Sequence, residues 1–279
     1  MKATVFLGAG RITNALLAGL RRARYDKPII VYDRNRNKLR VVEKHYGVHT
    51  ERDFHRAVAK AGLLIIAVQP RSVPDLLREI GKVDRPLIAV SLAAGIPLSR
   101  LRAQAKSVRW ARAMPSPACR GGRGLTALAF ERSLPTTAKK TVRNLFAQVG
   151  PVLEIPETQF DAFTVTYSSS HGYHAVAALA AAAEKLGLDG EHALTVAAHA
   201  LADGILAWRE GQTSLQALLH EATTPGGIAA GVIESMDRAG YKRAIARGLA
   251  EGMKRLRKNA RLATQSQSFS QPEKTHGRV

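Results

Sequence analysis

The stretch VFLGAGRITNALLAGL, residues 5–20, decides the fold. In it, an apolar strand, a glycine turn and an amphipathic helix follow one another without a break. Gly8 permits the tight turn, and Gly10 lets a pyrophosphate approach the backbone where the helix opens at Arg11. Thr13 stands where a third glycine or alanine is more usual. This order of elements predicts dinucleotide binding in the first part of the chain.

Strand-like and helix-like segments alternate from this motif to about residue 155. Short apolar runs that stop at Gly, Asp or Pro predict buried strands, and the segments between them have the apolar spacing of helices. Such alternation predicts an α/β fold with a doubly wound parallel sheet, which we assign to residues 1–155. The expected strands lie within residues 3–10, 28–34, 62–70, 86–95, 124–130 and 150–156, and the expected helices cover 12–24, 38–46, 73–80 and 98–105.

From Glu157 onward the strands disappear, and alanine and leucine recur at helical spacing. We expect an all-α domain over residues 156–262 and a disordered polar tail over 263–279. The apolar run Ala175–Ala183 needs cover on every side, and one small bundle has too few large residues to supply it. We therefore predict a homodimer or a higher homo-oligomer formed through these helices. The expected helices lie near 161–187, 190–210, 213–222, 227–239 and 241–260.

Composition narrows the class of protein. The 279 residues carry a formal net charge of +20, but the basic residues are dispersed and no nucleic-acid-binding motif accompanies them. We therefore expect no nucleic-acid partner and interpret the charge as favouring small anions such as a phosphate or a carboxylate. The longest alanine-rich run is about half a membrane span, and the first apolar run meets its glycine turn too early for a signal peptide. The single cysteine, Cys119, suits a reducing compartment, so we expect a cytoplasmic protein without membrane contact.

The end of the second expected strand gives two conflicting signals about the nucleotide. Asp33 is an acid of the kind that binds the ribose hydroxyls of NAD, whereas Arg34 and Arg36 could hold the 2′-phosphate of NADP. The surplus of arginine favours NADPH, with Asp33 turned aside, and leaves NADH open. The alternative is that both arginines only cap a surface turn.

A second motif, EATTPGGIAAGV at residues 221–232, places proline and glycine where a helix is about to begin. The start of a helix exposes unpaired N–H groups and the positive end of the helix dipole, which suit an anion. An ordinary junction between loop and helix is the alternative interpretation.

Taken in order, these motifs resemble the pyrroline-5-carboxylate reductase family up to about residue 260. The similar stretches are GAGRITNALLAGL, LLIIAVQPRSVPDLLREI, VSLAAGIPLSRL, RAMPSPA, GLTAL and TTPGGIAAG. The resemblance implies a Rossmann-type domain followed by an all-α dimerisation domain, NADPH as reductant, and a cyclic imine bearing a carboxylate as substrate. The residues expected at the cofactor are Gly8, Gly10, Arg11, Ile12, Asp33, Arg34, Ala67, Val68, Gln69, Pro70 and Ala93.

The resemblance also implies that the loop before residue 228 holds the substrate carboxylate through backbone N–H groups. The residues expected there are Thr224, Gly226, Gly227, Ile228 and Ala229. Ile228 and Ala229 replace two threonines of the family, so the hydroxyl that faces the imine nitrogen in the family is absent.

Four side chains are candidates for the lost catalytic role: Thr224, Ser169, Tyr167 and His171. His171 and His174 have a spacing that could bind a metal on a helix, but no further ligand accompanies them, so we expect no metal. Trp110 and Trp208 are expected in the core.

The favoured function is the reduction of 1-pyrroline-5-carboxylate to L-proline by hydride transfer from C4 of the nicotinamide to the imine carbon. Two alternatives stay open: a related reductase for another cyclic imine or a keto acid, and a non-catalytic relative that only binds the nucleotide.

Overall fold

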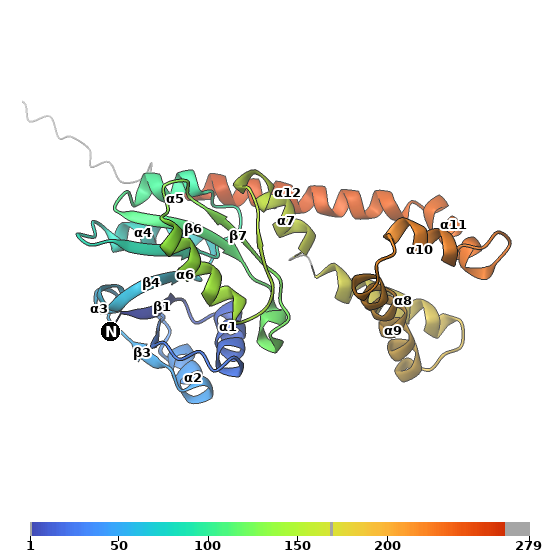
Figure 1. The fold of residues 1–279 in the computed structure, drawn as a ribbon, viewed down its shortest axis with the longest axis horizontal. Helices are drawn as coiled ribbons and strands as arrows, with labels where there is room; N and C mark the ends of the chain where they lie inside the picture. The colour runs from blue at the N-terminus through green and yellow to red at the C-terminus, as the bar shows by residue number, and fades with distance from the viewer. Residues whose placement is uncertain (1, 168–169, 266–279) are drawn as a thin grey trace, which may run out of the picture. The chain divides into compact units, whose positions relative to one another are not determined.

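The structure is a computed structural model that describes residues 2–167 and 170–265 (Figure 1). The chain divides into two compact units. One comprises Met1–Val165 together with Met253–Val279, and the other comprises Thr166–Gly252.

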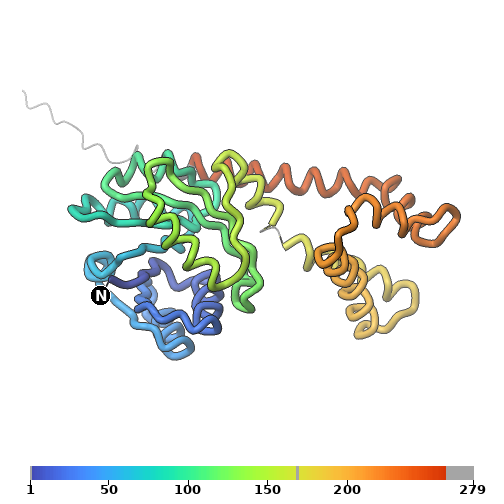
Figure 2. Tube along the Cα trace, viewed as in Figure 1, coloured from blue at the N-terminus to red at the C-terminus, as the bar shows by residue number. Residues whose placement is uncertain are grey.

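The first unit alternates strands and helices along the chain, which Figure 1 draws as arrows and coils and Figure 2 follows as a continuous trace. Its strands are β1 (Ala3–Leu7), β2 (Ile29–Tyr32), β3 (His49–Glu51), β4 (Ala61–Ile66), β5 (Leu87–Ser91), β6 (Val108–Met114), β7 (Thr126–Phe130) and β8 (Val152–Glu154). Its helices are α1 (Arg11–Arg22), α2 (Arg36–Tyr46), α3 (Phe54–Lys60), α4 (Val73–Ile80), α5 (Leu98–Gln104), α6 (Thr136–Ala147) and most of α7 (Glu157–Tyr167), with the short 3₁₀ helices η1 (Pro70–Ser72) and η2 (Pro117–Gly121).

The strands form one sheet in the order β3-β2-β1-β4-β5-β6-β7-β8. All neighbouring pairs are parallel except β6 and β7, which are antiparallel. The chain moves outward from β1 in one direction to β3 and then returns to β4 on the other side. The carboxyl ends of β1 and β4 therefore flank the point where the strand order reverses, which is where open α/β sheets bind ligands.

Side chains on the two faces of the sheet form two separate cores. Val5 and Leu7 of β1 join one core with Leu76 and Leu77 of α4, whereas Phe6 between them joins the other core with α1 and α6. This alternation follows from the period of two in a strand, and burial on both faces explains the continuous apolar runs. The doubly wound parallel sheet predicted from the sequence is confirmed, although strands β3 and β6 and the antiparallel pairing of β6 with β7 were not predicted.

The second unit is helical, as expected. It contains α8 (His171–Lys185), α9 (Gly190–Glu210), α10 (Leu215–Ala222), α11 (Ile228–Arg238) and the first half of α12 (Tyr241–Gln265). The single helix expected over 161–187 is wrong, because α7 ends at Tyr167 and α8 begins at His171. Ser170, the residue before α8, is in the left-handed conformation at φ 57°, and its side chain forms no hydrogen bond that caps the helix. Helix α12 continues to Gln265, three residues into the segment expected to be a disordered tail; residues 266–279 lie outside the described part of the chain.

Large apolar side chains of the second unit remain exposed in the single chain. Its own core is a small cluster of Ala180, Ala193 and Ala197 between α8 and α9. Trp110 is fully buried in the first unit, but Trp208 is 39% exposed, so the prediction for Trp208 is wrong for an isolated chain. Within the described residues, no helix combines the length and apolar character needed to cross a bilayer.

Candidate functional site

The turn after β1 requires glycine at its first position and is open at the second. Gly8 has φ +110°, and a Cβ atom there would lie 2.8 Å from the carbonyl oxygen of Ala67. A Cβ atom on Gly10 would have no atom within 4 Å. Thr13 is buried and donates its hydroxyl hydrogen bond to the Gly8 carbonyl at 2.6 Å. The threonine at the third small position therefore braces the turn.

The start of α1 can receive an anion. Gly10 is its N-cap, no side chain of the described residues caps it, and its first turn, which includes Arg11 and Ile12, holds no acid. The first N–H groups of a helix and the positive end of its dipole suit a phosphate. Together with the open space over Gly10, this arrangement fits the pyrophosphate of a dinucleotide.

Asp33 faces the backbone of this turn. Its Oδ2 accepts from the Ala9 N–H at 2.8 Å, and its Oδ1 accepts from the Asn35 N–H at 2.8 Å. Both oxygens therefore stabilise the loops after β1 and β2. This geometry agrees with the interpretation that Asp33 is turned aside from the ribose.

Arg34 projects into solvent beside Asp33 and pairs with Glu79 of α4, with 3.3 Å between Nη2 and Oε2. The hydrogen bond to Glu79 raises the pKa of Arg34 above its ordinary value. A cavity of about 120 Å³ opens here, and its lining includes Gly8, Asp33, Arg34, Phe54, Leu76 and Glu79. Sequence reasoning found the first half of this set. It missed Phe54, Leu76 and Glu79, which come from helices whose link to the cavity is visible only in the fold.

The residues after β4 that are expected at the cofactor lie at the same carboxyl edge of the sheet as the turn after β1. Ala67 donates its N–H to the Leu7 carbonyl at 2.9 Å, which ties the end of β4 to the end of β1. Val68 also lines the cavity, Gln69 is exposed, and Pro70 begins η1. The structure thus gathers these residues with Gly8 at the carboxyl edge.

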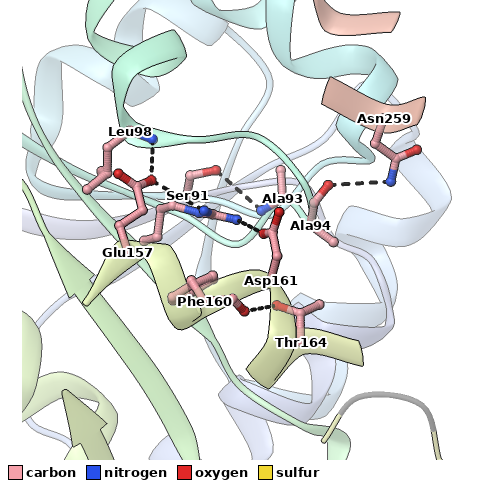
Figure 3. A network of polar contacts seen from close by, with 10 residues as sticks. Ser91, Ala93, Ala94, Leu98, Glu157, Phe160, Asp161, Thr164 and Asn259 are labelled. Atoms are coloured by element: carbon pink, nitrogen blue, oxygen red, sulfur yellow. Dashed lines mark hydrogen bonds and ion pairs between the residues drawn. The ribbon is translucent and has the colours of Figure 1, made fainter. Parts of the chain in front are cut away.

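The loop after β5 carries Ala93, which is buried and donates its N–H to the Ser91 hydroxyl at 3.3 Å (Figure 3). The second half of α12 packs on this loop, because Asn259 donates to the Ala94 carbonyl at 3.4 Å. Gly95 has φ +81°, and a Cβ atom there would lie 2.5 Å from the Leu256 carbonyl oxygen. The bracing by α12 was not foreseen from the sequence.

A buried cation lies beside this loop. Arg112 of β6 is 2% exposed and contacts two carboxylates of α7, Glu157 at 3.3 Å and Asp161 at 3.1 Å. Its guanidinium carbon also lies 4.1 Å from the centre of the Phe160 ring. Glu157 accepts a further hydrogen bond from the Leu98 N–H at 2.6 Å (Figure 3). One arginine thus joins β6, α7 and, through Glu157, the start of α5.

In the second unit, the loop between α10 and α11 forms a turn followed by an uncapped helix. Gly226 has φ +78°, and the Gly227 N–H donates to the Thr224 carbonyl at 2.9 Å. The expected donation from Gly227 to a ligand is therefore not available in this conformation. Ile228 and Ala229 begin α11, which no described side chain caps, so their N–H groups can meet an anion.

The remaining candidates lie near the junction of α7 and α8. Tyr167 is the last residue of α7 and is partly exposed, and His171 is the exposed first residue of α8. Ser169 lies outside the described residues. The catalytic roles of these side chains and of Thr224 stay predictions.

Cys119 is not placed to act as a catalytic side chain. It is fully buried in η2, and burial raises the pKa of its thiol to about 11. Within the described residues, His, Cys, Asp and Glu side chains form no group of three that could hold a metal.

Two family models match the chain. Residues 157–259 match the model described as pyrroline-5-carboxylate reductase dimerisation, and residues 4–95 match the one described as NADP oxidoreductase coenzyme F420-dependent. The chain is 37% identical over 203 residues to a pyrroline-5-carboxylate reductase of Thermus thermophilus, which covers 71% of this chain and 76% of the relative.

Other relatives extend the match to most of the chain. A pyrroline-5-carboxylate reductase of Mycobacterium tuberculosis is 29% identical over 276 residues, which covers 88% of this chain and 92% of the relative. The crystal structure of a Plasmodium falciparum pyrroline carboxylate reductase with NADP bound has a TM-score of 0.83 at 20% identity and covers 93% of this chain and 98% of that one. At that identity the likeness concerns the fold.

Proposed function

The chain belongs to the pyrroline-5-carboxylate reductase family, and we propose from this that it reduces 1-pyrroline-5-carboxylate to L-proline with NADPH. The observation that carries the proposal is the match to the Thermus thermophilus reductase over three quarters of that protein. The resemblance seen in the motifs is thereby confirmed. The chain is an NAD(P)-dependent oxidoreductase, and its helical domain serves homo-oligomerisation.

The first unit supplies the nucleotide site. The start of α1 holds the pyrophosphate, since Gly10 leaves space and Arg11 and Ile12 offer N–H donors. Arg34 attracts the 2′-phosphate through its exposed guanidinium, while Asp33 is held against the backbone of the turn. Val68, Gln69, Pro70 and Ala93 border the remainder of the dinucleotide. When bound, the reduced nicotinamide supplies a hydride to the imine carbon.

The second unit holds the substrate. The N–H groups of Ile228 and Ala229 bind its carboxylate, and the turn from Thr224 to Gly227 fixes the loop. Backbone donors do not depend on side-chain identity, so this role survives the loss of the two family threonines. The chain then needs only to orient the imine and supply one proton to its nitrogen.

Candidates for the proton or for orientation are Tyr167, Ser169, His171 and Thr224. A general acid contributes about 10²–10⁴ in rate, so replacing the correct residue lowers kcat by that order. Four single variants distinguish these candidates when their kcat values are compared at saturating substrate. The variants are Tyr167→Phe, Ser169→Ala, His171→Asn and Thr224→Val.

Purified protein tests the proposal directly. NADPH oxidation is followed after 1-pyrroline-5-carboxylate is added, and L-proline is identified by chromatography. The proposal requires one proline per NADPH consumed. Binding of NADPH without its oxidation by any imine or keto acid tested would instead identify a non-catalytic relative.

One observation favours a second function, the reduction of another cyclic imine or a keto acid. Ile228 is 90% exposed in the single chain and stands with Ala229 in place of two threonines. A more apolar rim would suit a more apolar substrate. A faster rate with a cyclic imine lacking further polar groups would support this alternative.

A further inference from the structure

Glu79 is an acidic residue at the part of the nucleotide cavity where a phosphate is expected. It lies in the last full turn of α4 and lines the same cavity as Asp33 and Arg34. Its carboxylate accepts a hydrogen bond from Arg34 at 3.3 Å, although the two residues are 45 positions apart in sequence. The fold therefore brings together a cation suited to a 2′-phosphate and an anion that competes for it.

The stability of the fold does not explain this pair. The Arg34 side chain is 73% exposed, and an exposed ion pair contributes little to folding. The helix dipole also disfavours a carboxylate near the C-terminal end of a helix. The position of Glu79 is better explained by what it does to a ligand in the cavity.

The charges around the cavity direct the effect of Glu79 to a 2′-phosphate that approaches Arg34. Each oxygen of Asp33 accepts one hydrogen bond from a backbone N–H group, from Ala9 or from Asn35, which fixes the carboxylate against the turn. Among the described residues that line the cavity, Arg34 is the cation and Glu79 is the carboxylate that contacts it. Although the chain as a whole carries +20, an incoming 2′-phosphate here meets an arginine that is already paired.

We propose that Glu79 determines how strongly the protein distinguishes nucleotides with a 2′-phosphate from those with a 2′-hydroxyl, by occupying Arg34. This inference rests on the proposed function and deepens it. In the wild-type protein the 2′-phosphate must share Arg34 with Glu79 and approach that carboxylate, so part of its binding energy is lost. A neutral side chain at position 79 removes that competition and leaves the adenine and pyrophosphate contacts unchanged.

Binding of nucleotide fragments tests the proposal without any turnover. Affinities for 2′,5′-ADP and for ADP are measured by calorimetry with wild type and Glu79→Gln. The substitution should raise the affinity for 2′,5′-ADP about fivefold, the upper range for an exposed ion pair, and change that for ADP less than twofold. High salt should reduce the gain, because exposed charges are screened. An unchanged ratio of the two affinities overturns the proposal.

A matched control is available on the same helix. Asp75 pairs with Arg78 on α4 and does not line the cavity, so Asp75→Asn removes the same charge and should leave both affinities unchanged. An equal gain with Asp75→Asn would mean that the overall charge matters and Glu79 does not.

Two further results test the role of Arg34 and the binding of nucleotide separately. With Arg34→Gln, the addition of Glu79→Gln should no longer raise the affinity for 2′,5′-ADP; a gain that persists in full overturns the role of Arg34. If neither ADP nor 2′,5′-ADP binds to the wild-type protein, the proposed function itself fails. Binding of both with no effect of Glu79→Gln refutes only the inference.

Discussion

The two glycines of the turn after β1 are needed for different reasons. Gly8 has a backbone conformation that L side chains rarely adopt, and a Cβ atom there would collide with the Ala67 carbonyl at 2.8 Å. Gly10 is extended at φ −78° and has open space around it. The first glycine serves the fold, and the second serves a ligand.

Alanine substitutions should separate these two roles. Gly8→Ala is expected to cost about 1–3 kcal/mol of unfolding free energy through strain. Gly10→Ala should cost about 1 kcal/mol or less, yet weaken ADP binding because its methyl group fills the space over the turn. Urea unfolding and calorimetry give the two quantities. Equal losses of stability in both variants would contradict this division.

Cys119 provides a prediction with a defined pH window. Burial raises the pKa of its thiol to about 11 from an ordinary value of 9.0. Above pH 9 the unfolded chain releases this proton while the folded chain keeps it, so the contribution of Cys119 to stability is complete below pH 9 and is lost as the pH rises towards 11.

The same thiol should resist labelling in the native protein. Since the sequence holds one cysteine, the reaction with a thiol reagent at pH 8 reports on this residue alone. Native protein should react orders of magnitude more slowly than protein in urea. Rapid labelling of the native state would show that the core around η2 opens readily.

What could be predicted about single residues depends on how far apart their partners lie. The position of Asp33 could be inferred because a motif and its neighbouring arginines bear on it. The contacts of Arg34 with Glu79 and of Asn259 with Ala94 join residues 45 and 165 positions apart, and no local pattern encodes them. Pairing at that range follows only from the completed fold.

At the scale of elements, the sequence predicted strands where apolar residues run together and missed those that carry charge. Strand β6, VRWARAM, contains Arg109 and Arg112 and was not predicted. Helix α3 was also missed because its seven residues are too short to show a helical repeat, and α6 because its first half, TTAKKT, is mostly polar. Arg112 shows the physical reason: a buried cation is tolerated only with partners, and its partners come from α7, 45 and 49 positions later.

The contact between β6 and α7 should therefore depend on the two carboxylates together. Glu157→Gln leaves Arg112 paired with Asp161 and is expected to cost about 1–3 kcal/mol. The double variant Glu157→Gln with Asp161→Asn leaves a buried cation without a counter-ion, which costs about 3–5 kcal/mol. Unfolding in urea measures both.

An exposed pair gives the matching control. Arg143 and Glu154 form an ion pair with side chains 43% and 40% exposed, so Glu154→Gln should cost about 1 kcal/mol or less. If the double variant at α7 is no less stable than this control, Arg112 does not need its carboxylates and the contact is held by apolar packing alone.

For the molecule as a whole, the second unit buries little of its apolar surface within one chain. Its core consists of three alanines, while Leu194, Leu206 and Val232 are each more than half exposed in the single chain. Exposed apolar area of this extent on consecutive helices marks an interface. The excess of small and apolar residues therefore predicted the homo-oligomer correctly, although it could not specify which faces meet.

The interface can be tested with a charge on α11. Val232 is 53% exposed, so Val232→Glu adds an anion without disturbing the chain's own core. Buried against a partner, the carboxylate would lose its hydration at a cost of several kcal/mol, enough to lower the association constant by orders of magnitude. Light scattering after gel filtration should show smaller particles for this variant than for wild type. Thr137→Glu places the same charge at an exposed position of α6, in the first unit, and should leave the particles as large as those of wild type. Identical masses for wild type and Val232→Glu would place the interface on another face of these helices.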